Sequence, residues 1–291
     1  MFDFFKNKKS GDGIFILFDI GGTKMRVAVS RDGFEMSEPK VASTPKNFSE
    51  GLRMLNKMAD EIAGYNAKIK AGSGGFAGIL NRDCRTIFRS PHLPLWNGQP
   101  LRAELERLLG APVFLENAAA LAGLGEATFG AGEGHGIVAY FTVSTGLGGV
   151  RVVGGKIDQK VFGFEPGHQI INIGGIKSEG GGELEGYVSG EAVLRRFGKK
   201  AETVSSRAIL DELAFYLASG IYNSVLHWSP DIVVLGGPMI LGKNPIDVKR
   251  VELELDKLLK IFPEPPFVKK AVLGDKGGLY GALKLASDYV S

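Results

Sequence analysis

Residues 14–30 read IFILFDIGGTKMRVAVS, and this stretch decides the fold. The run from Ile14 to Ile20 is apolar except for Asp19. Residues 24–30 then alternate between polar and apolar, as a returning strand does. The intervening Gly21-Gly22 predicts a tight turn whose backbone can approach a ligand closely. The sequence therefore predicts a strand, a glycine turn and a second strand.

The same pattern recurs at residues 136–153. There a strand over 136–142 leads into Ser144-Thr145-Gly146-Leu147-Gly148-Gly149, and a second strand follows over 150–153. Two occurrences of one unit predict two related α/β lobes with mixed sheets, and the boundary is expected near residue 118.

The remaining elements follow from periodicity and from the glycine clusters. Buried strands are expected at residues 112–115 and 232–235, and the glycine-rich run 71–80 reads as a strand end entering a binding loop. Helical patterns occupy six further stretches, namely residues 49–69, 101–109, 118–129, 184–197, 206–227 and 248–259.

Composition and charge restrict the classes of partner and location. Of the 291 residues, 44% are apolar and 23% charged, and the 35 basic residues nearly balance the 32 acidic ones to give a net charge of +3. This balance argues against nucleic acid or a membrane surface as the main partner. A single cysteine, Cys84, excludes an intramolecular disulfide, and no stretch approaches the length of a membrane span. We therefore expect a cytoplasmic protein.

The glycine turns predict phosphate binding. Glycines after a strand let backbone N–H groups face phosphate oxygens, and the Thr23 hydroxyl adds a donor. Asp19 could hold Mg²⁺ through water, because this cation keeps much of its hydration shell. The alternative is a plain hairpin with a solvated aspartate. A third glycine pair, Gly236-Gly237, ends an apolar strand and would let a flat base lie against the backbone.

An ordered set of motifs carries a family resemblance. They are DIGGTK at 19–24, LENAAALAGLGEATFGAG at 115–132, STGLGGV at 144–150, EPGH at 165–168, ELEGYVSG at 183–190 and VVLGGP at 233–238. Together they resemble the ROK family of sugar kinases and related repressors. The resemblance implies an α/β, two-lobed hexokinase/actin-like ATPase (ribonuclease H-like) fold with an interlobe active site. It divides the chain into an N-terminal lobe over 1–117 and a C-terminal lobe over 118–277, with the C-terminal helix 278–291 a candidate to complete the first lobe.

By this resemblance the cofactors are ATP and Mg²⁺, and the partner is a small sugar. The first phosphate loop would be formed by Asp19, Gly21, Gly22, Thr23 and Lys24, with Asp19 also facing Mg²⁺. The second loop would include Thr145, Gly146 and Gly148, and the adenosine would lie beside Gly236 and Gly237. The residues implied to hold the sugar are Gly75, Gly78, Asn117, Glu165, His168 and Glu185. The resemblance also allows a homodimer.

One catalytic position departs from the family pattern. The family usually reads Glu-Asn-Asp, and its aspartate accepts the proton of the attacking sugar hydroxyl, whereas this chain reads Glu116-Asn117-Ala118. Losing such a general base costs about 10²–10⁴ in rate. Glu126 cannot replace it, because eight residues of helix separate the two positions by roughly 12 Å. Ala118 is either natural or an engineered Asp→Ala change, and we favour the latter because the other site residues are kept.

A second departure concerns zinc. Many family members follow the GH motif with a site of one histidine and three cysteines, but residues 171–183 contain no cysteine. Zinc prefers thiolate and imidazole ligands in closed tetrahedral sites, so we predict no zinc site. His168 would then be oriented by hydrogen bonds.

The sequence therefore predicts ATP-dependent phosphorylation of a hexose or an N-acetylhexosamine, impaired at Ala118. The alternative is a non-catalytic sugar-binding or sensing protein, and another phosphoryl donor such as polyphosphate also stays open. Residues 1–13 are too few for a helix-turn-helix domain, so Lys6, Lys8 and Lys9 read as a solvated terminus and no DNA-binding regulator is expected. The motifs do not specify which sugar is used.

Overall fold

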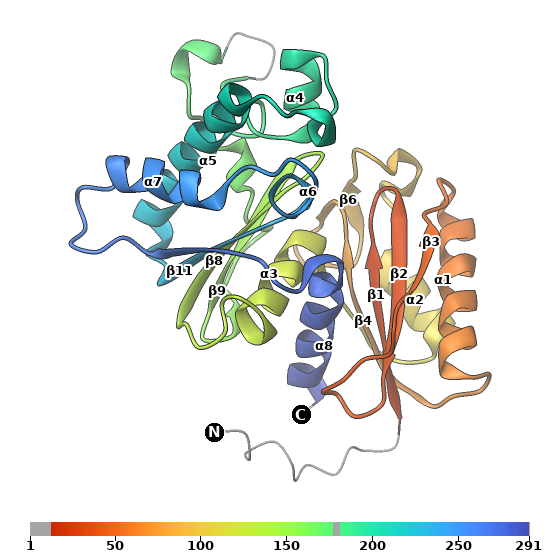
Figure 1. Cartoon of the computed structure of the whole chain (residues 1–291). Helices are drawn as coiled ribbons and strands as arrows, with labels where there is room; N and C mark the ends of the chain where they lie inside the picture. Colours follow the sequence, from red (N-terminus) through yellow and green to blue (C-terminus); the bar gives the residue numbers. More distant parts are fainter. Residues whose placement is uncertain (1–12, 177–180, 291) are drawn as a thin grey trace. The chain divides into compact units, whose positions relative to one another are not determined.

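The computed structural model describes residues 13–176 and 181–290, so Lys6, Lys8 and Lys9 lie outside the described residues. The chain divides into two compact units (Figure 1). Unit 1 contains the residues up to Leu121 and those from Gly278 onward, and unit 2 contains Ala122–Gly277. The lobe boundaries expected from the sequence lie after residues 117 and 277.

Unit 1 is built on a five-stranded mixed sheet with the order β3-β2-β1-β4-β7. β1, β2 and β3 form an antiparallel meander, while β4 and β7 run parallel to β1. A two-stranded hairpin, β5-β6, follows β4. The strands are β1 (Ile14–Ile20), β2 (Lys24–Ser30), β3 (Lys40–Ser43), β4 (Ile69–Phe76), β5 (Ile79–Leu80), β6 (Ile87–Arg89) and β7 (Val113–Asn117).

The alternation of side chains along β1 separates the two faces of this sheet. Ile16, Phe18 and Ile20 belong to one core together with residues of α1 (Phe48–Ala63) and α2 (Leu101–Leu109). Asp19 points to the other face, toward α8 (Gly277–Val290), which Figure 1 shows on the side of the sheet away from α1.

The last helix is closely packed on unit 1. A Cβ atom added at Gly281 would lie 1.9 Å from the Leu121 carbonyl oxygen, so only glycine permits this approach. Tyr289 stacks on Phe114 of β7 with ring centroids 4.5 Å apart. The Ser287 hydroxyl donates to the carbonyl of Gly33 at 3.1 Å. α8 therefore completes unit 1 although about 150 residues of another unit precede it.

Unit 2 repeats the strand order of unit 1, as β10-β9-β8-β11-β12. β8, β9 and β10 are again antiparallel, and β11 and β12 again run parallel to the first strand of the meander. The strands are β8 (Ile137–Val143), β9 (Leu147–Val153), β10 (Lys156–Ile157), β11 (Ile232–Gly236) and β12 (Phe267–Lys270). The predicted α/β class with two mixed sheets is confirmed.

Helices cover both faces of this second sheet. Phe141 and Val233 belong to the core that includes α5 and α7, whereas Tyr140 points to the opposite face, against α3. The helices are α3 (Ala118–Phe129), α4 (Gly190–Phe197), α5 (Arg207–Trp228), α6 (Pro238–Leu241) and α7 (Val248–Leu258).

Two predicted helices were too long. The helix expected over 49–69 ends at Ala63, because Gly64 and Asn66 have left-handed φ values of 90° and 64°. The helix expected over 184–197 begins only at Gly190, where the Ser189 side chain accepts a hydrogen bond from the Ala192 N–H and caps it. The prediction also missed the short strands β3, β5, β6, β10 and β12 among the described residues.

Candidate functional site

In unit 1, the predicted residues gather where the parallel strands end. Asp19 pairs with Gly75 across β1 and β4, and Gly75 pairs with Glu116 across β4 and β7. Carboxyl ends of parallel strands meet at one edge of a sheet, which is the usual place of a binding site in α/β proteins. The sheet thus positions Asp19, Gly75 and the β7–α3 junction as neighbours.

Asp19 lies beside the first glycine turn. Its carboxylate is 3.4 Å from the Arg26 guanidinium, and its side chain is 18% exposed. The turn itself is closed by a hydrogen bond from the Gly21 N–H to the Lys24 carbonyl at 2.9 Å, while the Thr23 and Lys24 side chains are exposed. A partly exposed carboxylate fits Mg²⁺, which is often held by one or two carboxylates, water and substrate phosphates.

The carbonyl groups of this turn are held by the segment after β3. The Thr44 hydroxyl donates to the Gly21 carbonyl at 2.7 Å, and the Thr44 N–H donates to the Thr23 carbonyl at 2.9 Å. Lys46 Nζ donates to the Gly22 carbonyl at 3.3 Å. No motif in the sequence indicated Thr44 or Lys46.

Asn117 joins the end of β7 to the loop that follows β4. Its Oδ1 accepts from the N–H groups of Ala119 and Ala120, at 2.8 and 3.2 Å, and so caps α3. Its Nδ2 donates to the Gly78 carbonyl at 3.1 Å. An asparagine amide has two N–H donors, so the Asn117 side chain can donate one further hydrogen bond.

The position expected for the general base is Ala118, the first residue of α3. Its Cβ lies 3.3 Å from where a Cβ at Gly75 would be. The two nearest acids in the sequence are engaged elsewhere. Glu116 is buried and accepts from the Asn117 N–H at 2.7 Å, and Glu126 accepts from the N–H groups of Ala131, Val272 and Leu273. Glu126 therefore has a structural role in unit 2.

In unit 2, the second glycine turn connects β8 to β9. Its carbonyls are also held, but mostly by backbone donors at the start of α4. The N–H groups of Gly190 and Glu191 donate to the Ser144 and Thr145 carbonyls at 2.8 and 3.1 Å. The Gly146 carbonyl accepts from the Ser144 N–H at 2.8 Å. Gly148 lies within β9 and not in the turn, because the strand begins at Leu147.

The predicted sugar-binding acids of unit 2 lie next to this turn. Glu185 Oε2 accepts from the Leu147 N–H at 2.5 Å, and a Cβ at Gly146 would be 2.5 Å from the same oxygen. The segment containing Glu165 and His168 runs alongside residues 182–187, joined by hydrogen bonds from Glu185 N to Gly167 O and from Leu184 N to Gln169 O. This pairing brings Glu165, His168 and Glu185 together.

His168 is oriented by a carboxylate. Its Nδ1 is 2.8 Å from Glu183 Oε2, and because a carboxylate only accepts, Nδ1 carries the proton and Nε2 is left for another partner. The hydrogen bond to Glu183 raises the pKa of His168, and the charges of Glu183, Glu185 and Glu165 act in the same direction against burial. Burial raises the pKa of Glu165, opposed by the nearby His168 charge.

Among residues 13–176 and 181–290, no group of three or more histidine, cysteine or acidic side chains is placed to hold a metal ion. Of the stretch 171–183 on which the zinc prediction rests, residues 177–180 lie outside the described part of the chain. In the described part, Glu183 is the side chain that contacts His168 Nδ1.

Gly236 is the last residue of β11, and Gly237 follows it beside the second turn. The space of a side chain at Gly236 is filled by the Tyr140 hydroxyl, 2.5 Å from where a Cβ would be. Gly237 has a φ of 88°, and its Cβ would lie 2.4 Å from the Val143 carbonyl. Both glycines therefore allow β11 and β8 to approach closely, and they lead directly into Pro238.

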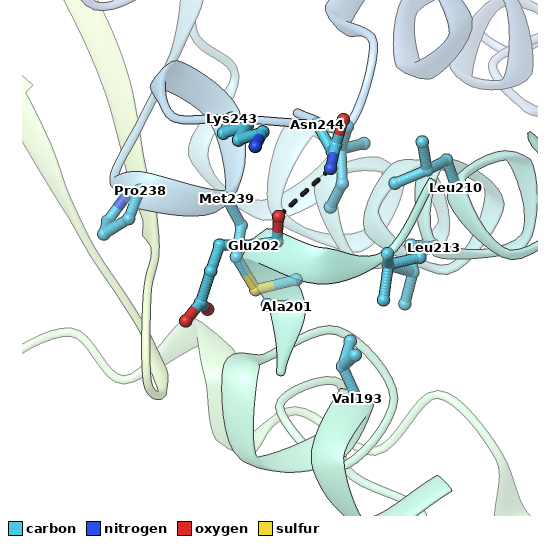
Figure 2. A pocket seen from close by; sticks show the side chains of 11 residues that line it. Val193, Ala201, Glu202, Leu210, Leu213, Pro238, Met239, Lys243 and Asn244 are labelled. Carbon is cyan, nitrogen blue, oxygen red and sulfur yellow. Dashed lines mark hydrogen bonds between the residues drawn. The ribbon is translucent and has the colours of Figure 1, made fainter. Parts of the chain in front are cut away.

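Pro238 lines a pocket in unit 2 (Figure 2). Its walls include the apolar side chains of Val193, Leu213 and Met239, with Glu202, Lys243 and Asn244 as polar members. Asn244 Nδ2 donates to the Glu202 carbonyl at 3.0 Å, which joins the residues after α6 to those before α5. Apart from the paired glycines next to it, no motif in the sequence indicated this pocket.

None of the helices within the described residues combines the length and apolar character that crossing a lipid bilayer requires.

The whole architecture has known relatives. The chain is 34% identical over 275 residues to a glucokinase of Streptomyces coelicolor, an alignment that covers 92% of this chain and 84% of that protein. Among solved structures, a ROK hexokinase from Thermus thermophilus superposes with a TM-score of 0.82 at 29% identity, covering 95% of this chain and 99% of the other. A ROK family glucokinase from Streptomyces griseus, in complex with glucose and AMPPNP, gives a TM-score of 0.79 at 25% identity, covering 95% and 100%. The model of the ROK family matches residues 15–289, and the chain therefore belongs to the ROK family.

Proposed function

We propose that this chain is a ROK sugar kinase that binds a hexose or an N-acetylhexosamine together with Mg·ATP, and that Ala118 impairs its turnover. One observation carries the proposal. Glu185, an expected sugar-binding residue, shares a hydrogen bond with the second glycine turn, an expected phosphate-binding element. A kinase needs its acceptor and its phosphate group held in such proximity, because positioning supplies much of the catalysis.

The sugar in this proposal binds to polar side chains. They are the carboxylates of Glu165 and Glu185, the Nε2 atom of His168 and the second N–H of the Asn117 side-chain amide. Gly75 and Gly78 keep the adjacent backbone free of side chains. Several fixed acceptors and donors of this kind reject analogues that lack the matching hydroxyl group.

The nucleotide is ATP in this proposal. Its base occupies the pocket at Pro238 and Met239, whose apolar walls suit a flat heterocycle. Its phosphates are held by the N–H groups of the two glycine turns. Asp19 holds Mg²⁺ through water, and the ion when bound neutralises phosphate charge during transfer.

In this proposal the missing base impairs turnover without removing the groups that bind the substrates. The residue after Asn117 is Ala118, which has no carboxylate, and both Glu116 and Glu126 accept hydrogen bonds from backbone N–H groups. The acceptor hydroxyl consequently loses a residue to take its proton, while the groups that position sugar and phosphate are kept. The kept residues favour an engineered Asp→Ala change over gradual decay.

The same observation supports a second candidate, a sugar-binding or sensing protein without catalysis. An alanine at the base position with no replacement acid is what such a protein requires. The two candidates differ in whether restoring an aspartate restores phosphorylation.

The test is a coupled phosphorylation assay over a panel of hexoses and N-acetylhexosamines, with ATP or polyphosphate as donor, beside calorimetric sugar binding. We expect the chain to bind one of these sugars and Ala118→Asp to raise its turnover about 10²–10⁴-fold with ATP. Binding without turnover in Ala118→Asp would support the second candidate instead. Turnover with polyphosphate alone would overturn the choice of ATP, and a chain that binds no sugar would overturn both.

A further inference from the structure

The first glycine turn is held by a segment outside any recognised motif, residues 44–46. Three successive carbonyl groups of the turn, those of Gly21, Gly22 and Thr23, accept hydrogen bonds from Thr44 and Lys46. Such complete engagement fixes the orientation of the peptide planes in the turn.

The orientation of the carbonyls sets the direction of the phosphate-facing donors. In a trans peptide the C=O of one residue and the N–H of the next point in opposite directions. The described residues contain no cis peptide. Because the Gly21 carbonyl points toward Thr44, the Gly22 N–H points away from Thr44. Likewise, because the Gly22 carbonyl points toward Lys46, the Thr23 N–H points away from Lys46.

Lys46 makes a second contact, with the segment that contains His92 and packs on the turn. Lys46 Nζ also donates to the His92 carbonyl at 3.0 Å. The His92 Cβ lies only 2.4 Å from where a Cβ at Gly22 would be, so His92 packs directly on the turn. One ammonium group thus ties together the two segments that border Gly22.

The supporting segment is itself rigidly held. Thr44 is buried, the Pro45 carbonyl accepts from the buried Trp96 side chain at 3.2 Å, and Asn47 caps α1 by accepting from the Glu50 N–H. The hairpin does not depend on these side chains for its register, because the pairing of β1, β2 and β3 already fixes it. The side chains of Thr44 and Lys46 are therefore available to set the peptide orientation of the turn.

We propose that Thr44 and Lys46 are positioning residues for nucleotide phosphate, acting through the peptide planes of Gly21 and Gly22. This inference rests on the proposed function, since it assumes that the first turn binds the phosphates of ATP. It adds two residues that determine nucleotide affinity and leave sugar affinity alone.

The test is calorimetric titration of the unaltered chain and its variants with Mg·AMPPNP, and separately with the sugar that the panel identifies. We expect Thr44→Val and Lys46→Met each to weaken Mg·AMPPNP binding about fivefold to tenfold, the effect of one misdirected hydrogen bond. Thr44→Ser, which keeps the donor, is expected to restore the affinity, and sugar binding is expected to stay within about twofold.

Lys57→Met is the matched control, because Lys57 is an exposed lysine of α1 that forms an ion pair with Glu61 at 3.9 Å. Unchanged Mg·AMPPNP affinity in Thr44→Val and Lys46→Met would overturn the inference and leave the proposed function standing. An unaltered chain that does not bind Mg·AMPPNP would overturn both. If Thr44→Val fails to fold, the Lys46→Met variant still tests the inference, because Lys46 is exposed and its substitution leaves the core intact.

Discussion

The two glycine turns look alike in the sequence but are supported in different ways. The turn between β1 and β2 has its carbonyls held largely by side chains, those of Thr44 and Lys46. The turn between β8 and β9 has its carbonyls held by backbone N–H groups at the start of α4 and its Leu147 N–H held by Glu185. Substituting Thr44 or Lys46 therefore changes the support of the first turn directly. The support of the second turn depends on where α4 begins and on the Glu185 carboxylate.

The largest effect is expected at that carboxylate. Glu185→Ala removes the acceptor of the Leu147 N–H and a proposed sugar contact, so we expect sugar affinity to fall about 100-fold, as for two charge-assisted hydrogen bonds. Glu191→Ala is the control, because Glu191 supports the turn through its backbone N–H, which the substitution keeps. Calorimetric titration with sugar measures both, and equal losses in the two variants would contradict the assignment.

Adding a methyl group to each turn separates the two supports further. In Gly22→Ala the new Cβ meets the His92 Cβ at 2.4 Å, and the free energy of unfolding is expected to fall by about 2 kcal/mol through overpacking. In Gly146→Ala it meets the end of the Glu185 side chain, which can move, so a loss below about 1 kcal/mol is expected. Urea denaturation of both variants gives the comparison, which a greater loss in Gly146→Ala would refute.

The next prediction concerns Ser189, the N-cap of α4. Ser189 is buried, and its hydroxyl accepts from the Ala192 N–H at 3.0 Å at the start of the helix that holds the second turn. We expect Ser189→Ala to lower the free energy of unfolding by about 1 kcal/mol, as loss of an N-cap does. Thermal or urea unfolding measures this, with Ser189→Thr as the variant that keeps a cap. Indistinguishable stabilities for Ser189→Ala and the unaltered chain would show that the cap contributes nothing.

The smallest effect concerns pH and the pair of His168 and Glu183. Because the pKa of His168 is raised in the folded state, the pair contributes stability below the unfolded pKa of about 6.5, and this contribution is lost as pH rises through the folded pKa. Both side chains are partly exposed, so the free energies of unfolding of the unaltered chain and Glu183→Gln should differ by less than about 1 kcal/mol.

Urea unfolding at pH 5.5 and pH 9 (roughly one unit below and well above the ordinary histidine pKa) measures this difference. We expect the gap in stability between the unaltered chain and Glu183→Gln to be larger at the lower pH. A gap that grows toward pH 9 would reverse the sign of the argument. Glu191→Gln, at an exposed glutamate of the same unit, controls for the loss of one negative charge.

Much of the fold could be predicted because the residues that begin and end its helices are also visible as local patterns in the sequence. The helices 101–109 and 118–129 have the predicted bounds, and in the second case Asn117 is both the last residue of a strand and the cap of the helix. The helix expected over 184–197 begins late because the N–H groups of Leu184 and Glu185 instead donate to the Gln169 and Gly167 carbonyls, a contact that periodicity does not encode.

The site could be predicted only as far as its motifs reach. Glycine turns and the acids within motifs are local features of the sequence. The partners that hold them are not, since Glu185 lies 38 residues from Leu147 and Thr44 lies 23 residues from Gly21. Glu183 could have been suspected, because it occupies a motif two residues before Glu185, but its contact with His168 depends on the pairing of two irregular segments.

The close packing of α8 on unit 1 has a consequence for how the protein is made. A nascent chain that has reached Gly277 contains the whole of unit 2, but it lacks the helix that packs against Leu121 and Phe114. We expect a chain ending at Gly277 to show protease-resistant unit 2 and protease-sensitive unit 1, and equal resistance of both would contradict this. On the ribosome the inserted unit can then mature first, while the unit that begins the chain waits for its last helix to emerge.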